Sequence, residues 1–370
     1  MLIIDGDYPL ACGAVDWNRD LTLPIDQVRS AEPATQKSGV WPDDQTMASL
    51  PEMRRGRIAA ALMKMCARIS RPGSPLWGHR SGELSYAAAQ AQLAYYRVLD
   101  DTDQVRILKT KQDMARHMRS WSEASDFDDM PVGAVLGLEG ADPILWPEQV
   151  HQWADSGTRV VSLTHYGVGT YAHGTGTGTD GELFPLAEPL LVEMEKAGMI
   201  LDVTHASDES MRQALDIFGG PVLASHHNCR SLVPGERQLP DELLGRIIDR
   251  GAVIGTSMDT WMLYKPGLDW GGDFPSRRSV FRREAVTLEH VADHIDHVCQ
   301  LAGDALHAAI GGDTDGQGGT DGAPLEIDTV ADYQKLVGVL ERRGYATEDI
   351  ENIMHGNWQR FFETWLPDET

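Results

Sequence analysis

The sequence is poor in cysteine and has no long hydrophobic run, and each shortage excludes a class of protein. Its cysteines, which are widely spaced and form no CxxC pair, are Cys12, Cys66, Cys229 and Cys299. Such spacing is typical of free thiols in a reducing compartment and not of a disulfide-stabilised scaffold. No stretch approaches the roughly 20 apolar residues that a membrane-spanning helix needs. We therefore expect a cytoplasmic protein without a membrane segment.

Basic residues are also scarce. The chain has 32 lysines and arginines against 56 aspartates and glutamates, which gives a formal net charge of −24. A surface of this sign repels phosphate backbones and anionic lipids, so neither nucleic acid nor membrane is expected as a partner. The first residues are apolar and are followed at once by Asp5 and Asp7, unlike the basic start and apolar core of a secretion signal. The expected ligand is a small molecule.

Short apolar runs alternate with longer amphipathic segments along the 370 residues, which is typical of strand–helix–strand units in a parallel sheet. The predicted strands are Leu2–Ile4, Val132–Leu138, Val160–Thr164, Met199–Val203, Val222–Ala224, Ala252–Gly255 and Ala308–Gly311. Because α/β barrels often exceed roughly 250 residues as one unit, we predict a single α/β barrel domain over residues 1–370. Residues 29–51 lack periodicity and are rich in Pro, Asp, Gln and Ser, which predicts a surface insertion.

Six of the predicted strands end in carboxylates or histidines that are followed by small or loop residues. These residues are Asp5 with Asp7, Glu139, His165, His205, His226 and Asp313. In a barrel the carboxyl ends of all strands point to one mouth, where active sites are built. One such histidine is more often structural, but six positions together favour a metal site. Imidazole and carboxylate groups suit zinc, and a catalytic zinc keeps three protein ligands and one open position.

The order of several short motifs resembles the membrane (renal) dipeptidase family, which consists of metal-dependent barrels of the amidohydrolase type. The motifs are Leu138-Glu139-Gly140, Leu163-Thr164-His165, Asp202-Val203-Thr204-His205, Ser225-His226, Arg237-Gln238-Leu239-Pro240-Asp241 and Gly311-Gly312-Asp313. The resemblance runs over nearly the whole chain. It implies a (β/α)8 barrel with a metal site at the carboxyl ends of its strands. It also implies hydrolysis of a dipeptide or of another small amide that carries a free carboxylate.

The resemblance further implies which residues hold metal. Glu139 corresponds to the family's bridging carboxylate, and His205 and His226 correspond to the two histidines of its second metal site. Asp313 corresponds to the aspartate of the first metal site. In a site with one metal, Asp313 is expected to accept a proton from the attacking water and to pass it to the leaving amine.

Two further residues are implied to bind substrate. His165 matches the histidine that polarises the scissile carbonyl, and Arg237 matches the arginine that pairs with the substrate carboxylate. A guanidinium fork suits a planar carboxylate in a way that an ammonium group does not.

The N-terminal motif departs from the family pattern, in which a histidine and an aspartate stand two residues apart. This chain has Asp5-Gly6-Asp7-Tyr8-Pro9 instead. Asp7 can still offer an oxygen to a metal, whereas Pro9 cannot ligate anything. We therefore expect one tightly bound divalent metal, zinc, and a second that is weak or absent.

Two other functions remain open at this stage. One is a repurposed hydrolase that acts on a different small molecule with a single metal, and the other is a non-catalytic barrel with a binding role. A homodimer is also admissible. Finally, His290, His294 and His297 recur at helical spacing, and we interpret them as a surface helix face and not as another metal site.

Overall fold

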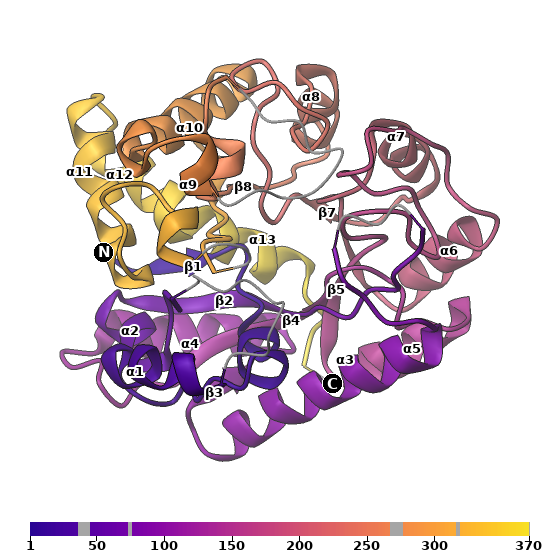
Figure 1. Ribbon diagram of the computed structural model, residues 1–370, viewed down its shortest axis with the longest axis horizontal. Coiled ribbons are helices and arrows are strands. Elements are labelled where there is room, and N and C mark those ends of the chain that lie inside the picture. The colour runs from indigo at the N-terminus through magenta and orange to yellow at the C-terminus, as the bar shows by residue number, and fades with distance from the viewer. Residues whose placement is uncertain (36–44, 73–75, 267–276, 316–318, 370) are drawn as a thin grey trace.

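The computed structural model describes residues 1–35, 45–72, 76–266, 277–315 and 319–369. At its centre short parallel strands form a ring, which helices surround (Figure 1). The hydrogen-bonded order is β1 (Ile3–Asp5), β2 (Ile58–Met65), β4 (Val132–Leu138), β5 (Thr158–Ser162), β6 (Ile200–Asp202) and β7 (Val222–Leu223), and a separate pair consists of β8 (Ile254–Thr256) and β9 (Ala308–Ile310).

Backbone hydrogen bonds at two places close the ring. Gly255 N donates to Ala224 O at 2.8 Å, which joins β8 to the end of β7. Gly6 N donates to Ile310 O at 2.9 Å, which joins β1 to β9. These eight strands confirm the predicted (β/α)8-type barrel. The remaining strand, β3 (Val105–Ile107), pairs with the start of β4 and is not part of the ring.

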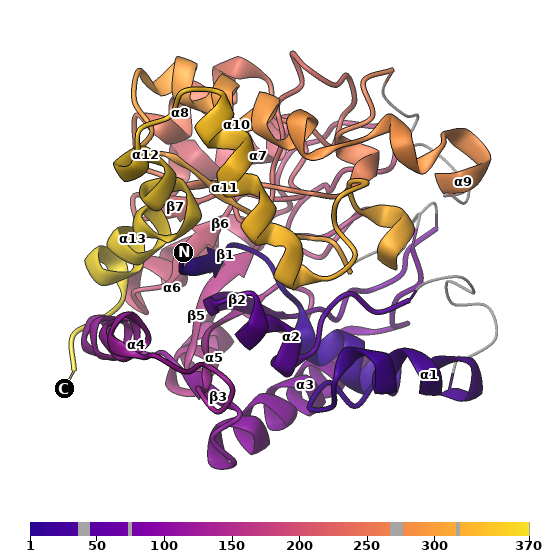
Figure 2. The same cartoon turned by 90° about the vertical axis from the view of Figure 1, so that its left-hand side faces the viewer.

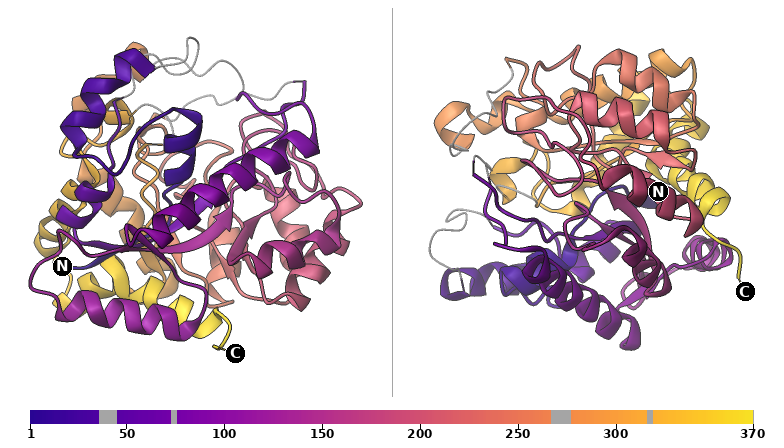
Figure 3. Two further views of the ribbon diagram at one scale, coloured as in Figure 1. Left: turned by 90° about the horizontal axis from the view of Figure 1, so that it is seen from below. Right: turned by 90° about the vertical axis from the view of Figure 1, so that its right-hand side faces the viewer.

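The wall of the barrel separates two apolar cores. Successive strand residues face opposite sides, so in β2 Ala60 and Leu62 point inward, whereas Ala61 and Met63 pack toward the outer helices. The inner core continues into α4 (Lys111–Glu123) and α13 (Asn357–Trp365), which lie side by side (Figure 3, left). These two helices therefore close the mouth at the amino ends of the strands, and the opposite mouth is left for the site.

Local sequence signals explain where several helices begin and end. At the start of α4 the Thr110 hydroxyl accepts from Asp113 N, and the Asp113 carboxylate accepts from Thr110 N, which forms a capping box. The α10 helix (Leu288–Ala302) ends at Gly303, whose φ of 82° is accessible to glycine without strain. The longest helix of the described residues, α3 (Gly82–Asp101), crosses the outside of the barrel (Figure 2).

The other helices are α1 (Ile25–Thr35), α2 (Leu50–Arg55), α5 (Val150–Asp155), α6 (Ala187–Lys196), α7 (Asp208–Ile217), α8 (Asp241–Ile248), α9 (Arg277–Val280), α11 (Lys335–Arg342) and α12 (Thr347–Glu351). Single 3-10 turns occupy Pro147–Gln149, Thr260–Met262, Arg283–Ala285, Gly319–Gly322 and Val330–Gln334, and π-helical turns occupy Cys12–Asp16 and Asn352–Gly356. Among the described residues, no helix combines the length and the apolar character needed to cross a membrane.

The structure departs from the sequence-based expectations in two places. The strands β2 and β3 were not predicted from the sequence. In β2 the sequence IAAALMKM contains alanines and a lysine, which are depleted in strands and hide the strand pattern. Residues 29–51, predicted as a surface insertion, include the end of α1 and the start of α2, and residues 46–50 are buried. Residues 36–44 lie outside the described part of the chain, so the predicted insertion and single-domain division stay predictions.

Candidate metal and active site

The carboxyl ends of the ring strands bring the predicted site residues to one mouth of the barrel. Asp7 follows β1, Glu139 follows β4, His165 follows β5, His205 follows β6, His226 follows β7, and Asp313 follows β9. Arg237 lies on the loop between β7 and α8 and is fully buried beside them. The arrangement follows from the parallel topology, because every strand ends at the same rim.

Glu139, His205 and His226 form a group with the geometry of a metal site. The two histidine Nε2 atoms are 2.9 Å apart, and Glu139 Oε1 lies 3.1 Å from His205 Nε2 and 3.5 Å from His226 Nε2. Donor atoms about 2.1 Å from a tetrahedral zinc are themselves separated by roughly 3.4 Å. The three residues are at most 4% exposed. Two imidazoles and one carboxylate also match a known donor set of catalytic zinc, so the residues present fit such an ion.

The protonation states of these groups favour metal binding. Burial lowers the pKa of both His205 and His226 well below the usual value, so each imidazole is neutral, which is the state that binds a metal. Burial alone would raise the pKa of Glu139, but the positive charge of Lys64 outweighs it and holds that pKa below its usual value. Glu139 is therefore a carboxylate, as a ligand must be.

Backbone strain accompanies two of the site residues. His205 has a φ of 72° and Asp313 a φ of 59°, which place both in the left-handed region. A non-glycine residue there costs on the order of 1–3 kcal/mol and is retained mainly where function requires it. The turn directly after β6 aims His205 at Glu139, and the turn after β9 brings Asp313 beside Asp7, whose carbonyl accepts from Asp313 N.

A lysine that the sequence analysis did not single out lies at the centre of the site. Lys64, the penultimate residue of β2, is 0% exposed. Its Nζ atom lies 2.5 Å from Asp7 Oδ1, 3.1 Å from Glu139 Oε1 and 3.5 Å from Asp202 Oδ2. A lone charged residue in an otherwise apolar strand was the available signal, because such a residue is almost never fully buried unless it is paired.

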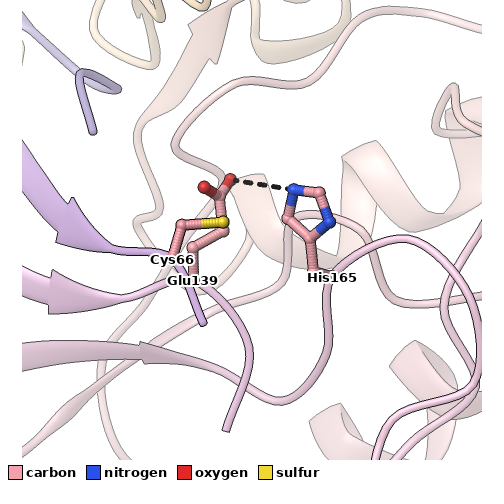
Figure 4. A group of neighbouring side chains, drawn as sticks. All are labelled: Cys66, Glu139 and His165. Carbon is pink, nitrogen blue, oxygen red and sulfur yellow. Dashed lines mark ion pairs between the residues drawn. The ribbon is translucent and has the colours of Figure 1, made fainter. Parts of the chain in front are cut away.

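His165 and its neighbours form the second part of the site. Figure 4 shows Cys66, Glu139 and His165 together, with His165 Nε2 3.9 Å from Glu139 Oε1. On the other side of the His165 imidazole, Arg68 Nη1 lies 3.2 Å from His165 Nδ1 and 3.4 Å from Cys66 Sγ. A guanidinium only donates, so Nδ1 must accept and the proton of the neutral ring must sit on Nε2. Arg68, also missed in the sequence, thus makes His165 Nε2 a donor facing the site.

Arg237 is held by neutral groups. Its Nη2 donates to the His226 carbonyl at 3.0 Å, its Nε donates to the Tyr166 hydroxyl at 3.2 Å, and its Nη1 is 3.3 Å from His227 Nδ1. Within the described residues, no carboxylate forms an ion pair with it. A buried guanidinium that no carboxylate of the protein pairs with is suited to bind the carboxylate of a ligand. His227 supports Arg237 and does not face the metal group, in line with its position next to His226.

Asp313 lies on the Asp7 side of the site, where its carboxylate is within 4.8 Å of Asp7 and His226. Ser257 Oγ donates to Asp313 Oδ2 at 3.1 Å. Burial, followed by the nearby Asp259 charge, raises the pKa of Asp313 to about 8. A carboxylate with a pKa near the working pH can both accept and return a proton.

In the described part of the chain, two other groups could contact a metal, and both overlap the first. Cys66, Glu139 and His165 form one, and Asp7, His226 and Asp313 form the other. In the former, Arg68 places a positive charge against Cys66 and His165. In the latter, Asp7 is already paired with Lys64. Lys64 contacts Glu139 as well, so charge alone does not separate the groups. The group of Glu139, His205 and His226 fits a metal best because, of the three, it is the one that offers two imidazoles beside a carboxylate.

Asp315 and the histidines of α10 are supporting residues. Asp315 accepts from Tyr8, Thr46 and Met47 and does not join a metal group. The interpretation of His290, His294 and His297 as a surface face was wrong for His294, which is buried and accepts from Cys229 N at 3.0 Å. That hydrogen bond fixes α10 to the loop after β7.

The fold and the site together define a barrel that can hold a metal on histidines and a carboxylate. The chain belongs to the membrane dipeptidase family, peptidase family M19, whose family model matches residues 14–365. An uncharacterized dipeptidase from Schizosaccharomyces pombe is 28% identical over 242 residues, which are 65% of this chain and 54% of that protein. The dipeptidase aclJ of Aspergillus oryzae is 28% identical over 229 residues, which are 61% of this chain and 50% of that protein. This chain thus spans about half the length of the curated relatives it matches.

Solved structures agree on the fold. A metallopeptidase from Rhodobacter sphaeroides, determined with a phosphinate mimic of the dipeptide L-Ala-D-Ala, aligns over 99% of both chains with a TM-score of 0.75. Its sequence is 17% identical to this one, so the likeness concerns the architecture alone.

Proposed function

We propose that this protein is a metal-dependent hydrolase that cleaves a dipeptide or another small amide carrying a free carboxylate. The observation that carries the proposal is the convergence of Glu139 Oε1 and the Nε2 atoms of His205 and His226 within 3.5 Å of one another. Membership of the dipeptidase family and the dipeptide mimic bound by the Rhodobacter sphaeroides protein support the substrate class.

Glu139, His205 and His226 would hold one divalent ion, with zinc the best match to their donor atoms. When bound, such an ion supplies Lewis-acid polarisation of the scissile carbonyl and an acidified water. The other residues then act on the substrate directly. His165 donates its Nε2 proton to the oxygen that gains negative charge, and Arg237 pairs with the substrate carboxylate.

Asp313 is the proposed acid and base. It accepts a proton from the attacking water and delivers it to the nitrogen of the leaving amine as the amide bond breaks. Its raised pKa supports both halves of this transfer near neutral pH. The cytoplasmic location, the homodimer and the lack of nucleic-acid and membrane partners stay predictions.

A hydrolase with a single metal and a different small substrate is the second candidate, because Lys64 occupies the Asp7 side of the site. Metal analysis of the purified protein, together with a library of L- and D-configured dipeptides and other small amides, tests both. We expect His205→Ala and His226→Ala to lose the metal and all turnover while keeping the circular-dichroism spectrum of the wild type. Wild-type metal content in both variants would refute the ligand assignment.

A further inference from the structure

Lys64 enters the site from inside the barrel. It shares the inward face of β2 with Ala60 and Leu62, and its stem passes over Gly137 of β4. A Cβ at Gly137 would come within 3.1 Å of Lys64 Cγ, so the absence of a side chain there makes room for the lysine. Together these features show that the side chain has a built position within the barrel wall.

The ammonium group is surrounded as a coordinated cation would be. Besides the oxygens of Asp7, Glu139 and Asp202, its neighbours are Ser225 Oγ at 3.2 Å and His226 Nδ1 at 3.5 Å. Asp7, Glu139 and Asp202 are each at most 4% exposed. Buried carboxylates persist only when they are paired, and Lys64 is the cation that pairs with all three.

We infer that the Lys64 ammonium group takes the place of one metal ion, so that the site combines a built-in cation with a single divalent ion. This inference deepens the proposed function and rests on it. Glu139 Oε1 is the shared atom: it lies 3.1 Å from Lys64 Nζ and 3.1 Å from His205 Nε2. Glu139 thereby links the ammonium group to the metal group of His205 and His226.

Among the described residues, the same contacts put the Lys64 ammonium group where a second metal on Asp7 would bind. A metal about 2.1 Å from Asp7 Oδ1 would lie close to the ammonium group, which is itself 2.5 Å from that oxygen. The alternative group of Asp7, His226 and Asp313 uses the same Asp7 carboxylate, and its His226 Nδ1 also faces Lys64. Restoring the family residues at positions 7 and 9 would therefore not rebuild a second metal site while Lys64 remains.

The test is to replace Lys64 and count metal ions. In Lys64→Met the side chain ends one atom short of Nζ, which vacates the cation position without emptying the barrel, and Lys64→Ala vacates it fully. After incubation with excess Zn²⁺ and dialysis, native mass spectrometry should find one zinc ion more in each variant than in the wild type. The melting temperature of each variant should also depend on zinc more strongly than that of the wild type. Lys196→Met, an equal change at an exposed residue of α6, is the matched control and should change neither.

The outcomes separate this inference from the proposed function. A gain of one ion over the wild type supports the replacement whether the wild type holds one ion or none, whereas a wild type without metal or turnover refutes the hydrolase alone. Two tightly held ions in the wild type would overturn the inference. So would variants that gain no ion, or that fail to fold with and without zinc, because a metal in this position should compensate for the lost charge.

Discussion

Arg237→Lys tests how this site would recognise its substrate. The change keeps the positive charge but removes the planar fork of donors that the arginine presents. A hydrogen bond to a charged group is worth about 1.5–3 kcal/mol, and each 1.36 kcal/mol is a factor of ten in rate. Loss of one such bond to the substrate carboxylate should therefore lower kcat/KM by about 10- to 150-fold.

The structure also gives Arg237 a second task that the experiment must separate. Its Nη2 donates to the carbonyl of His226, a proposed metal ligand, and the side chain is 0% exposed. A carboxylate can reach it only after a neighbouring group moves. If the arginine serves only to fix His226, its replacement should reduce metal content and slow every substrate alike.

The assay compares a dipeptide with its C-terminal amide, which has the same scissile bond without the carboxylate. Recognition by Arg237 predicts a large loss of kcat/KM for the dipeptide, little change for the amide, and wild-type zinc content. Arg246→Lys, at a partly exposed residue of α8, is the control for the chemical change itself. Equal losses for both substrates would refute the role in recognition and make Arg237 a structural residue.

Three further predictions follow from individual contacts. Asp313→Asn should lower kcat by about 10²–10⁴-fold without changing zinc content, and activity within a few-fold of the wild type would show that another group moves the proton. Arg68→Met should leave Nδ1 of His165 without its donor, so that the ring proton is no longer fixed on Nε2. We expect a lower kcat, with a loss smaller than the ~10²–10³-fold expected for removing the His165 donor altogether. An unchanged kcat would show that Arg68 does not fix the tautomer of His165. Burial lowers the pKa of His117 to about 4. The neutral ring therefore contributes fully to the free energy of unfolding above about pH 6.5, and this contribution is lost as the pH falls to about 4. The loss amounts to about 3 kcal/mol. Urea unfolding should thus show less acid destabilisation in His117→Gln, which keeps a donor for the Ala59 carbonyl, and equal pH dependence in both proteins would contradict this.

Much of the barrel and of the metal group could be predicted from local sequence. An apolar run followed by a histidine or a carboxylate specifies both a strand and the side chain at its end, and the structure places Glu139, His205 and His226 together as expected. Parallel strands in a barrel end at one rim, so the order of these residues along the chain was enough to bring them to one mouth.

Tertiary structure decided the residues whose role depends on distant partners. Lys64 has the sequence signature of an ordinary lysine in an alanine-rich segment. Its role follows only from Asp7, Glu139 and Asp202, which lie in or just after three other strands. Arg68 acquires its role only because the fold places His165, which follows β5, within hydrogen-bond distance of it.

The physical reason is that the pattern of apolar residues is a local property of the sequence, whereas the pairing of buried charges is not. The period of apolar residues along a strand records which face is buried, and this information is local. Whether a charged side chain can be buried depends on opposite charges within a few ångströms, and these come from residues 57, 75 and 138 positions away from Lys64 in the case of Asp7, Glu139 and Asp202. The sequence by itself therefore determined the barrel and the three side chains proposed to bind metal, whereas only the folded chain placed a cation of its own beside them.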